Sequence, residues 1–236
     1  MSSAELISRF EDNSAGLSQS AIATLNSDYA DLDFEARIRR VYEDFAPERI
    51  MVTSSFAATS AYFLHIISTI RPDQPIHFID TRYHFEETLR YKDYLTERFG
   101  LTVIDVVPDP AHHQVSLENR MWETDPDLCC QVNKVLPLEE AKENYDLWIS
   151  SLMGWQTEHR SGLSTFEVRR GMIKFNPMID VSKEERDRYI REHDLPFHPL
   201  VSQGYESIGC SHCTFKGEGR DGRWQGKTKT ECGLHL

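Results

Sequence analysis

The sequence predicts an α/β fold in which a parallel β-sheet is flanked by helices. Short apolar runs typical of strands alternate with longer stretches of helical periodicity between residues 49 and 150, and this alternation favours right-handed strand–helix–strand crossovers. The length of 236 residues fits one α/β domain with short appendages. A chain of this size buries most of its apolar surface without disulfide bonds.

The N-terminal part of the chain is polar and helical in pattern. Three short amphipathic helices are expected at 3–12, 17–26 and 33–44. The pattern then changes to a first strand at 49–53, which is followed by a mostly buried helix at 57–70. This part of the chain therefore leads from a helical segment into the sheet.

Three more strands complete the expected sheet. Aromatic and leucine side chains from Phe85 to Phe99 fall on one face of a helix, and Gly100 stands where a C-cap is expected. A later helix begins after Ser182, which forms the pattern of a capping box with Glu185. The strands are expected at 75–79, 101–107 and 145–150, and the other helices near 131–142 and at 182–193.

The expected binding loops lie at one edge of this sheet. Parallel α/β sheets bind ligands at the carboxyl ends of their strands, so the loops after Thr53, Ile79 and Ser150 are candidates. The last thirty residues are rich in glycine, lysine, arginine and cysteine. That composition indicates a segment organised by function rather than by core packing.

Charge and hydropathy exclude several classes of protein. The formal net charge is −12, which argues against a nucleic-acid partner, because nucleic-acid binders carry a basic field. Residues 1–12 are polar and acidic, without the apolar core of a signal peptide. The longest apolar stretch, around 61–70, is too short to span a bilayer. We therefore expect a cytoplasmic protein with no membrane partner.

Four of the five cysteines form two pairs. Cys129 and Cys130 are adjacent, and Cys210 and Cys213 form a Cys-x-x-Cys motif. Four thiolates can hold a zinc ion or a cubane iron–sulfur cluster. The adjacent pair favours the cluster, because zinc sites usually use two Cys-x-x-Cys knuckles. Four unrelated buried thiols and a thioredoxin-like redox motif remain as alternatives, although the nearby glycines indicate a loop rather than a helix start.

The fifth cysteine, Cys232, lies in a polar, glycine-containing tail. Lys227, Lys229 and His235 are close in sequence and are candidates to lower the pKa of its thiol, which would make it a nucleophile. Residues 216–230 contain five basic residues and two acidic ones. The tail therefore suits an anionic substrate in an otherwise acidic chain.

Together these motifs resemble the assimilatory adenylyl-sulfate (APS) and phosphoadenylyl-sulfate (PAPS) reductases, roughly over residues 45–236. The tail motif Glu231-Cys-Gly-Leu-His235 is the most specific match, and the two cysteine pairs mark the cluster-containing branch. Further matches are Ile79-Asp-Thr81 with Tyr83-His-Phe85, Asn176-Pro177, Gly204-Tyr-Glu-Ser-Ile-Gly-Cys210 and Arg220-Asp-Gly-Arg-Trp224.

The resemblance implies an adenine-nucleotide α-hydrolase-like fold of the PP-loop type with a functional C-terminal tail. It implies thioredoxin-dependent reduction of APS to sulfite and AMP through an S-sulfocysteine on Cys232, with PAPS as the alternative substrate. It also implies a homo-oligomer and a [4Fe–4S] cluster held by the two cysteine pairs. The implied parts of the chain are a helical segment at 1–47, a nucleotide- and cluster-binding domain at 48–215 and a catalytic tail at 216–236.

A substrate-binding set is implied as well. By resemblance, Lys134, Arg220 and Arg223 contact the sulfate and phosphate oxygens, a role that suits the planar fork of arginine. The other members of the set are Ser54, Ser55, Gln156, Arg160 and His235.

The sequence departs from the family pattern in three loops. Members commonly have glycine at the positions of Ala57 and Arg82, and they usually place arginines near Met153-Gly154. Two other classes of protein fit less well. A PP-loop sulfurtransferase would carry Ser-Gly-Gly-x-Asp-Ser where this chain has Ser55–Ser60, and a non-catalytic redox-sensing iron–sulfur protein would have no use for Cys232.

Overall fold

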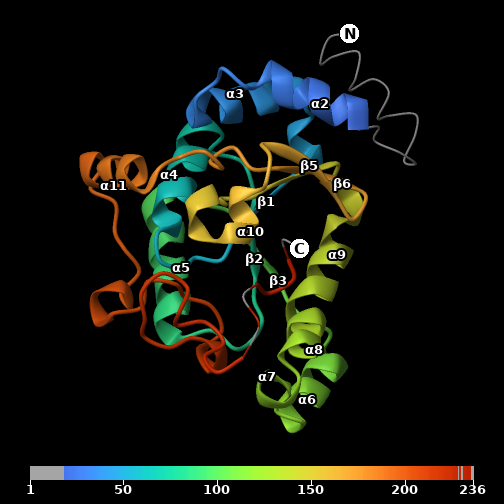
Figure 1. Ribbon diagram of the computed structural model, residues 1–236, viewed down its shortest axis with the longest axis vertical. Helices are drawn as coiled ribbons and strands as arrows, with labels where there is room; N and C mark the ends of the chain where they lie inside the picture. The colour runs from blue at the N-terminus through green and yellow to red at the C-terminus, as the bar shows by residue number, and fades with distance from the viewer. Residues whose placement is uncertain (1–18, 228, 230, 235–236) are drawn as a thin grey trace.

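The centre of the molecule is a six-stranded β-sheet (Figure 1). The structure is a computed structural model that describes residues 19–227, 229 and 231–234. Its strands are β1 (Ile50–Ser54), β2 (Ile76–Ile79), β3 (Val103–Val106), β4 (Leu147–Ile149), β5 (Phe166–Arg169) and β6 (Met172–Phe175). Their order is β3-β2-β1-β4-β6-β5, with every neighbouring pair parallel except β6–β5. The prediction of an α/β fold around a parallel sheet is confirmed.

Alternate residues of the central strands face two different layers. Ile50 and Val52 belong to a large apolar core, whereas Met51 between them belongs to a smaller cluster on the opposite face. The helices that cover the large core are α2 (Gln19–Asp28), α3 (Phe34–Asp44), α4 (Ser60–Ile70), α5 (Glu86–Phe99) and α11 (Lys183–Glu192). The smaller cluster contains Leu138 of α9 (Leu136–Ala141) and contacts Leu234 of the tail. The C-terminal tail is thus part of the covering of the second face.

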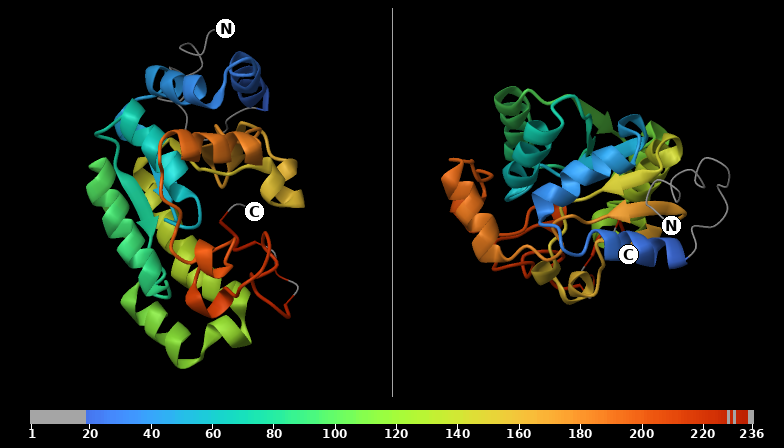
Figure 2. Two further views of the ribbon diagram at one scale, coloured as in Figure 1. Left: turned by 90° about the vertical axis from the view of Figure 1, so that its left-hand side faces the viewer. Right: turned by 90° about the horizontal axis from the view of Figure 1, so that it is seen from above.

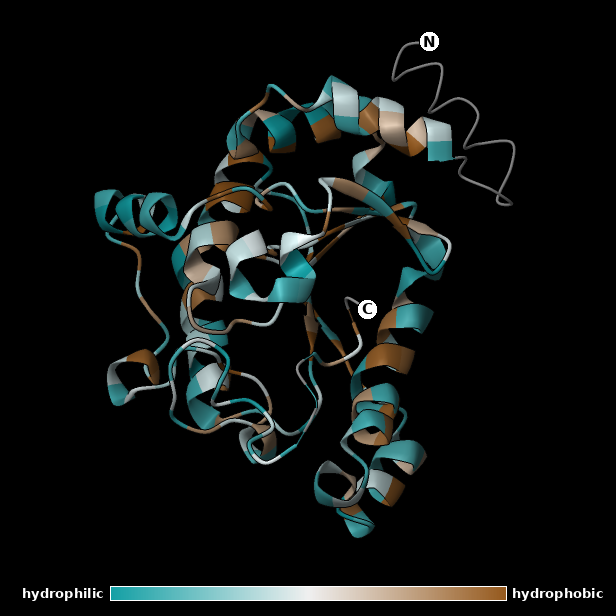
Figure 3. Cartoon of the chain, in the orientation of Figure 1, coloured by the Kyte–Doolittle hydropathy of each residue, from teal (hydrophilic) through white to brown (hydrophobic). Residues whose placement is uncertain are grey.

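The two faces are covered unequally. Helices α4 and α5 lie on one side of the strands and α9 on the other, while α2 and α3 lie across one end (Figures 1 and 2). Helix α11 is hydrophilic over nearly its whole length (Figure 3) and buries only Arg186 and Ile190. The large core therefore lies mainly between the sheet and the helices α2 to α5.

The expected helix ends are found where the sequence placed them. Gly100 adopts a left-handed φ of 63° after α5, which costs glycine little because it has no Cβ. Before α11, the Ser182 hydroxyl accepts a hydrogen bond from the Glu185 N–H at 3.1 Å. The observed helices at 34–44, 60–70 and 183–192 match the predicted ones to within three residues at either end.

Three helices between β3 and α9 were not expected. They are α6 (Pro110–Glu118), α7 (Met121–Thr124) and α8 (Pro126–Cys130). Their apolar residues do not form a stripe, and Val115 and Leu117 are exposed. The missed signal is the Asp-Pro pair that opens both α6 and α8, in which Asp109 and Asp125 cap the first turn and proline occupies its first position.

The helix expected near 131–142 is interrupted by a π-helical turn. This turn, η2 (Gln131–Val135), joins α8 to α9 without a break in the chain direction. The regular α-helical pattern resumes at α9, where Pro137 lies in the first turn and has no N–H to donate. The π turn carries Asn133 and Lys134.

A β-hairpin at the sheet edge was also missed. Strands β5 and β6 pair antiparallel with Arg169 opposite Met172. The two residues between them, Arg170 and Gly171, have φ values of 50° and 79°, as a two-residue hairpin turn requires. An arginine in the first turn position hid the signal, since asparagine or glycine is usual there.

The remaining short elements connect these units. They are η1 (Pro47–Arg49), η3 (Lys142–Asn144), η4 (Gly154–Gln156), α10 (Glu158–Ser161), η5 (Val201–Gln203) and η6 (Ser211–Cys213). The helix predicted at 3–12 and the first two residues of the one predicted at 17–26 lie outside the described residues. Within the described part of the chain, none of the helices has the length and apolarity needed to cross a membrane.

Candidate active site

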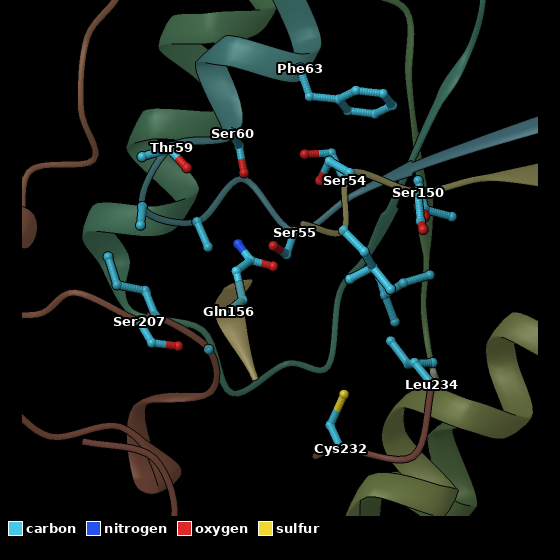
Figure 4. A pocket seen from close by; sticks show the side chains of 18 of the residues that line it. Ser54, Ser55, Thr59, Ser60, Phe63, Ser150, Gln156, Ser207, Cys232 and Leu234 are labelled. Carbon is cyan, nitrogen blue, oxygen red and sulfur yellow. The ribbon is translucent and has the colours of Figure 1, made fainter. Parts of the chain in front are cut away.

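A cavity of about 230 Å³ opens at the carboxyl ends of the parallel strands. Its walls include Thr53 and Ser54 from β1, Ile79 from β2 and Ser150 after β4. These are the three strand ends at which the sequence predicted ligand-binding loops. The tail closes one side of the cavity, where Cys232 and Leu234 lie across from the β1 loop (Figure 4).

The loop after β1 forms one wall of the cavity. It runs from Ser54 to Ser60, where α4 begins, and the N–H groups of Ser60 and Tyr62 donate to the carbonyls of Ala57 and Thr59. Phe56 takes a left-handed φ of 46° and is fully buried, with its ring edge against Phe78 at 5.5 Å between centroids. Ala57 stays at negative φ. The loop therefore needs no glycine at position 57.

The predicted substrate-binding residues converge on this cavity. One residue of the set, His235, lies outside the described residues. The members that line the cavity are Ser54, Ser55, Lys134, Gln156, Arg160, Arg220 and Arg223, together with the predicted nucleophile Cys232. They come from separate segments of the chain, which only the fold brings together.

Glu231 is the centre of a buried ion cluster beside the nucleophile candidate. Its carboxylate accepts hydrogen bonds from Arg160 Nε at 3.0 Å, Arg160 Nη2 at 3.1 Å and Arg220 Nη2 at 3.1 Å. Thr157 Oγ1 donates to it as well, at 3.2 Å. Burial acts to raise the pKa of Glu231, but the two guanidinium groups outweigh it, so the pKa is lowered and the carboxylate stays charged.

Among the three arginines of the described residues that line the cavity, Arg223 has the fewest polar contacts. It lies directly over Gly209, where a Cβ would come within 2.3 Å of its Nη2 atom. Its Nη1 atom is 3.5 Å from Ser207 Oγ, and its face packs on Trp224 at 4.5 Å from the ring centroid. The buried Nε has no hydrogen-bond partner within the described part of the chain. Arg223 is therefore available to an anionic ligand.

The Cys232 thiol has the electrostatic surroundings of a nucleophile. Burial acts to raise its pKa, but the Lys134 ammonium, a backbone hydrogen bond and Arg223 outweigh burial, and the pKa is lowered. Lys134 shows the reciprocal effect. Burial acts to lower the pKa of Lys134, but the thiols of Cys232 and Cys210 outweigh it, so the ammonium remains protonated. The predicted partners Lys227 and Lys229 instead bind the segment at 122–127, away from the thiol.

The other four cysteines gather around a second, much smaller cavity next to the first. Cys129, Cys130, Cys210 and Cys213 all line it, together with Lys134 and Arg223, which also line the large cavity. Three of these thiols are buried and Cys210 is partly exposed. Helix α8 with the π turn supplies one pair, and the loop around η6 supplies the other.

Polar side chains surround two of these sulfur atoms. Asn133 Nδ2 lies 3.7 Å from Cys129 Sγ and 2.8 Å from Ser116 Oγ, which itself lies 3.8 Å from the same sulfur. Thr81 Oγ1 lies 3.2 Å from Cys210 Sγ. Thr81 belongs to the matched motif Ile79-Asp-Thr81, but its contact with Cys210 was not predicted. Ser116 and Asn133 were not singled out from the sequence, because only the fold brings them to Cys129.

The cysteine quartet offers four sulfur donors around one small cavity. Burial, and then the neighbouring thiols, raise the pKa values of Cys129 and Cys213 to about 11, although hydrogen bonds to Cys129 act against this. Thiolates crowded in this way need a cation to stabilise them. No group of three or more potential ligands within the described residues has the arrangement of a ready metal site. The donor set, rather than a preformed geometry, is what fits a cluster.

The off-pattern loops add no cation to the large cavity. Arg82, at a left-handed φ of 62°, pairs with Asp80 at 3.2 Å and does not line the cavity. Met153 is buried in the apolar core, and a Cβ on Gly154 would lie 2.9 Å from the Ile179 carbonyl oxygen. The cations of the site therefore come from the tail, the π turn and α10.

The fold is an α/β fold of the PP-loop type. Residues 49–216 match the family model described as the phosphoadenosine phosphosulfate reductase domain. The chain belongs to the adenylyl-sulfate and phosphoadenylyl-sulfate reductase family, as the resemblance of its motifs predicted.

Curated relatives match over most of their length. An adenosine 5'-phosphosulfate reductase of Bacillus cereus (strain Q1) is 40% identical over 203 residues, which cover 82% of this chain and 86% of the relative. A protein of the same name from Chelativorans sp. (strain BNC1) is 38% identical over 220 residues, covering 90% and 89% of the two chains.

Solved structures support the fold. A phosphoadenylyl-sulfate reductase from Candida auris, solved with phosphate, superposes with a TM-score of 0.72 at 25% identity, covering 86% of this chain and all of that one (100%). A Candida glabrata FMN adenylyltransferase superposes with a TM-score of 0.56 at 11% identity, covering 92% and 73%. The second similarity concerns the fold alone.

Proposed function

We propose that this chain reduces APS to sulfite and AMP, with Cys232 as the nucleophile and thioredoxin as the reductant. The observation that carries the proposal is the position of Cys232. Its thiol lies in the same cavity as the loop from Ser54 to Ser60, beside Lys134 and Arg223, and its pKa is lowered. The names of the Bacillus and Chelativorans relatives support APS as the substrate.

The first chemical step transfers a sulfonate group to the enzyme. The Cys232 thiolate attacks the sulfur atom of the sulfate group, and the bond from this sulfur to the bridging oxygen breaks. The electron pair of that bond stays with the oxygen, which leaves as part of AMP. The products are AMP and an S-sulfocysteine, so the protein gains one SO₃ unit.

The second step reduces the adduct with a dithiol. A thioredoxin thiolate attacks Sγ of Cys232, sulfite leaves with the electron pair of the S–S bond, and a mixed disulfide forms. The second thioredoxin thiol then attacks the mixed disulfide, which releases the Cys232 thiolate and oxidised thioredoxin. The dithiol thus supplies the two electrons that reduce sulfate sulfur to sulfite.

Several groups of this chain support the first step. The Ser54 and Ser55 side chains, with the positive end of the α4 dipole, suit the phosphate of the nucleotide. Lys134 and Arg223 suit the charge that develops on the sulfate and bridging oxygens, because both face the cavity beside the thiol. An arginine fork binds two oxygens at once, whereas lysine acts as a point charge.

We also propose that Cys129, Cys130, Cys210 and Cys213 hold a [4Fe–4S] cluster. The donor set supports this, since four thiols line one small cavity and none of the described residues that line it is a carboxylate. When bound, the cluster would tie the π turn to the η6 loop and modify the charge around Lys134. The reductive chemistry itself needs only the thiols of Cys232 and thioredoxin.

PAPS is the second candidate substrate. The structural similarity to the Candida auris phosphoadenylyl-sulfate reductase supports it. The two nucleotides differ by a 3′-phosphate on the ribose, which the sulfonate transfer itself does not involve. A comparison of the two substrates on the same protein decides between them.

The test is the mass of the intact protein after incubation with APS or PAPS in the absence of thioredoxin. We expect one SO₃ unit to be added with APS, and none in the Cys232→Ser variant. An adduct that forms faster with PAPS would change the substrate but keep the mechanism. No adduct with either nucleotide would contradict the proposal, and iron and sulfide content with visible absorbance tests the cluster separately.

A further inference from the structure

The tail is anchored in the cavity by one buried carboxylate. Glu231 immediately precedes Cys232, and the side chain of Glu231 is 2% exposed. Arg160 binds it as a fork, through Nε and Nη2, and Arg220 binds it through Nη2. Both arginines were predicted to bind substrate, yet the fork of Arg160 is directed at the protein's own tail.

The other polar anchors of the tail are weaker. Lys229 pairs with Asp127, but the carboxylate of Asp127 is 84% exposed, so water and salt screen that pair. Lys227 donates to the carbonyls of Trp122 and Glu123 at the molecular surface. Removing one partner of a buried ion pair destabilises a protein much more than removing one partner of an exposed pair, because it leaves an uncompensated charge in the interior. Glu231 is therefore the anchor that decides where the tail lies.

The residues after Cys232 depend on this anchor. Gly233 turns the chain at a left-handed φ of 84°, and its carbonyl accepts a hydrogen bond from Arg170 Nη2 at 3.3 Å. Leu234 then packs against the apolar cluster that contains Met51 and Trp148. Cys232 lies between a charged anchor on one side and an apolar one on the other, and its thiol points into the cavity (Figure 4).

We propose that Glu231 is a positioning residue whose carboxylate, bound by Arg160 and Arg220, clamps the tail so that the Cys232 thiol stays inside the cavity. The inference deepens the proposed function and rests on Cys232 being the nucleophile. Its consequence is that Arg160 acts on the reaction through Glu231 rather than by contact with the substrate. Release of the clamp would expose Cys232 to a protein reductant.

A competing role for Glu231 makes a different prediction. The carboxylate could occupy the position of a substrate anion and have to leave before substrate binds. Removing it would then lower the nucleotide concentration at half-saturation and leave the maximal rate unchanged or higher. A clamp predicts the opposite, namely a lower maximal rate with half-saturation changed by less than about threefold, since the loss falls on the positioning of the thiol.

The first experiment needs no substrate and compares Glu231→Gln with the unmodified chain. Both are treated with iodoacetamide and with a bulky polymer-linked maleimide, and labelling of Cys232 is followed by peptide mass mapping. If the tail is released, the variant is labelled faster than the unmodified chain. We expect this increase to be at least tenfold larger for the bulky maleimide than for iodoacetamide. A change in thiol pKa would raise both rates together, so equal factors would overturn the clamp.

A matched control is available elsewhere in the chain. The Asp146 carboxylate, which lies outside the cavity, accepts two hydrogen bonds from the Arg49 guanidinium. They come from Nε at 2.8 Å and Nη2 at 2.6 Å. Asp146→Asn removes the same kind of pair and should leave both labelling rates of Cys232 unchanged. Arg160→Lys is a milder second variant, which keeps the positive charge but cannot form the two parallel hydrogen bonds. It should raise the ratio of maleimide to iodoacetamide labelling of Cys232 as Glu231→Gln does, by a smaller factor.

The second experiment measures formation of the sulfonate adduct in a single turnover. Glu231→Gln should lower the maximal rate at least tenfold, and Glu231→Asp, which keeps the charge, should recover part of it. If the nucleotide concentration at half-saturation falls and the maximal rate does not, the result would overturn the clamp in favour of the competing role. If the unmodified chain forms no adduct, the proposed function fails while the labelling result still reports on the clamp.

Discussion

Arg160 donates from Nε and Nη2 to the Glu231 carboxylate, at 3.0 and 3.1 Å, and so joins α10 to the residue beside Cys232. Arg220 binds the same carboxylate at 3.1 Å. Of the four lysines and arginines among the described residues that line the cavity, two thus share the Glu231 carboxylate of the tail, and their guanidinium groups are directed at it. Lys134 and Arg223 are left for the two anionic groups of an adenosine-linked sulfate.

Lys134 should control the pH dependence of adduct formation. Its charge is the largest influence that lowers the pKa of Cys232 against the opposing effect of burial. In Lys134→Met that pKa should rise, so less thiolate is present at neutral pH and the rate falls about tenfold for every pH unit by which the pKa rises. Because the thiolate forms as pH rises, the rate of the variant should recover in part at alkaline pH, and the remaining deficit reflects the lost charge beside the sulfate group. A pH–rate profile of single-turnover adduct formation measures this, and Lys216→Met, on the exposed part of the tail loop, should keep the original profile.

Gly209 should be required for the position of Arg223. A methyl group there would come within 2.3 Å of the guanidinium, while the backbone of Gly209 has no left-handed φ and accepts alanine. Gly209→Ala should therefore displace Arg223 and raise KM about 10- to 100-fold, the value of one charge-assisted hydrogen bond of about 1.5–3 kcal/mol. Arg223→Ala should do the same, and the double variant should be no worse than either one. At Gly162 a methyl group meets nothing closer than 3.7 Å, so Gly162→Ala should leave KM unchanged, and additive effects at 209 and 223 would contradict the prediction.

Asn133 should stabilise the bound cluster. Its side-chain amide lies within reach of Cys129 Sγ and holds Ser116 in place beside the same sulfur. Asn133→Ala should lose iron and acid-labile sulfide at least severalfold faster in air, because hydrogen bonds to ligand sulfur atoms protect it. The decay of visible absorbance measures this loss. The side chain of Asn119 donates to the backbone carbonyl of Val115 at the exposed end of α6. In Asn119→Ala the visible absorbance should decay at the original rate. Equal decay in the two variants would contradict a role of Asn133 at the cluster.

Lys174 should destabilise the fold in a pH-dependent way. It is fully buried, and its Nζ atom has no hydrogen-bond partner in the part of the chain that the structure describes. Burial lowers its pKa from 10.5 to about 8, a difference of about 3 kcal/mol. The unfolded chain binds this proton more tightly, so the penalty is complete below pH 8 and disappears as pH rises towards 10.5.

The variant Lys174→Met removes that charge at similar volume. We expect its free energy of unfolding to exceed that of the original chain by about 2 kcal/mol at pH 7, with the Trp148 ring offsetting part of the penalty in the original. The advantage should shrink between pH 8 and 10. Urea unfolding at several pH values measures it, with Lys183→Met on the exposed face of α11 as the control. A constant difference across this pH range would mean that the pKa of Lys174 is the same in the folded and unfolded chain, which would contradict the prediction.

The parallel sheet and the grouping of the four paired cysteines could be predicted because their signals are local. The strands are short apolar runs, Gly100 marks the end of α5, and the spacing of the cysteines is visible in the sequence. The role of Glu231 could not be predicted in this way. Its partners Arg160 and Arg220 lie 71 and 11 residues away, and a carboxylate in a polar tail ordinarily stays in water.

The helices before Cys129 and the β5–β6 hairpin were missed for a related reason. Helices α6 and α8 are stabilised by Asp-Pro starts rather than by an apolar stripe, and periodicity cannot detect them. The hairpin places an arginine where the turn favours small residues. Thr81, Ser116 and Asn133 reach their sulfur atoms only after these elements have folded.

The central claim is that sulfonate passes from the nucleotide to Cys232 before any electron transfer. The most direct test counts products in a single turnover of APS without thioredoxin, followed by addition of reduced thioredoxin. The account predicts one AMP released for each SO₃ found on the Cys232 peptide, and one sulfite released for each adduct once thioredoxin is added. Sulfite that appears before the thiol is added, or AMP released with no adduct on Cys232, would contradict it.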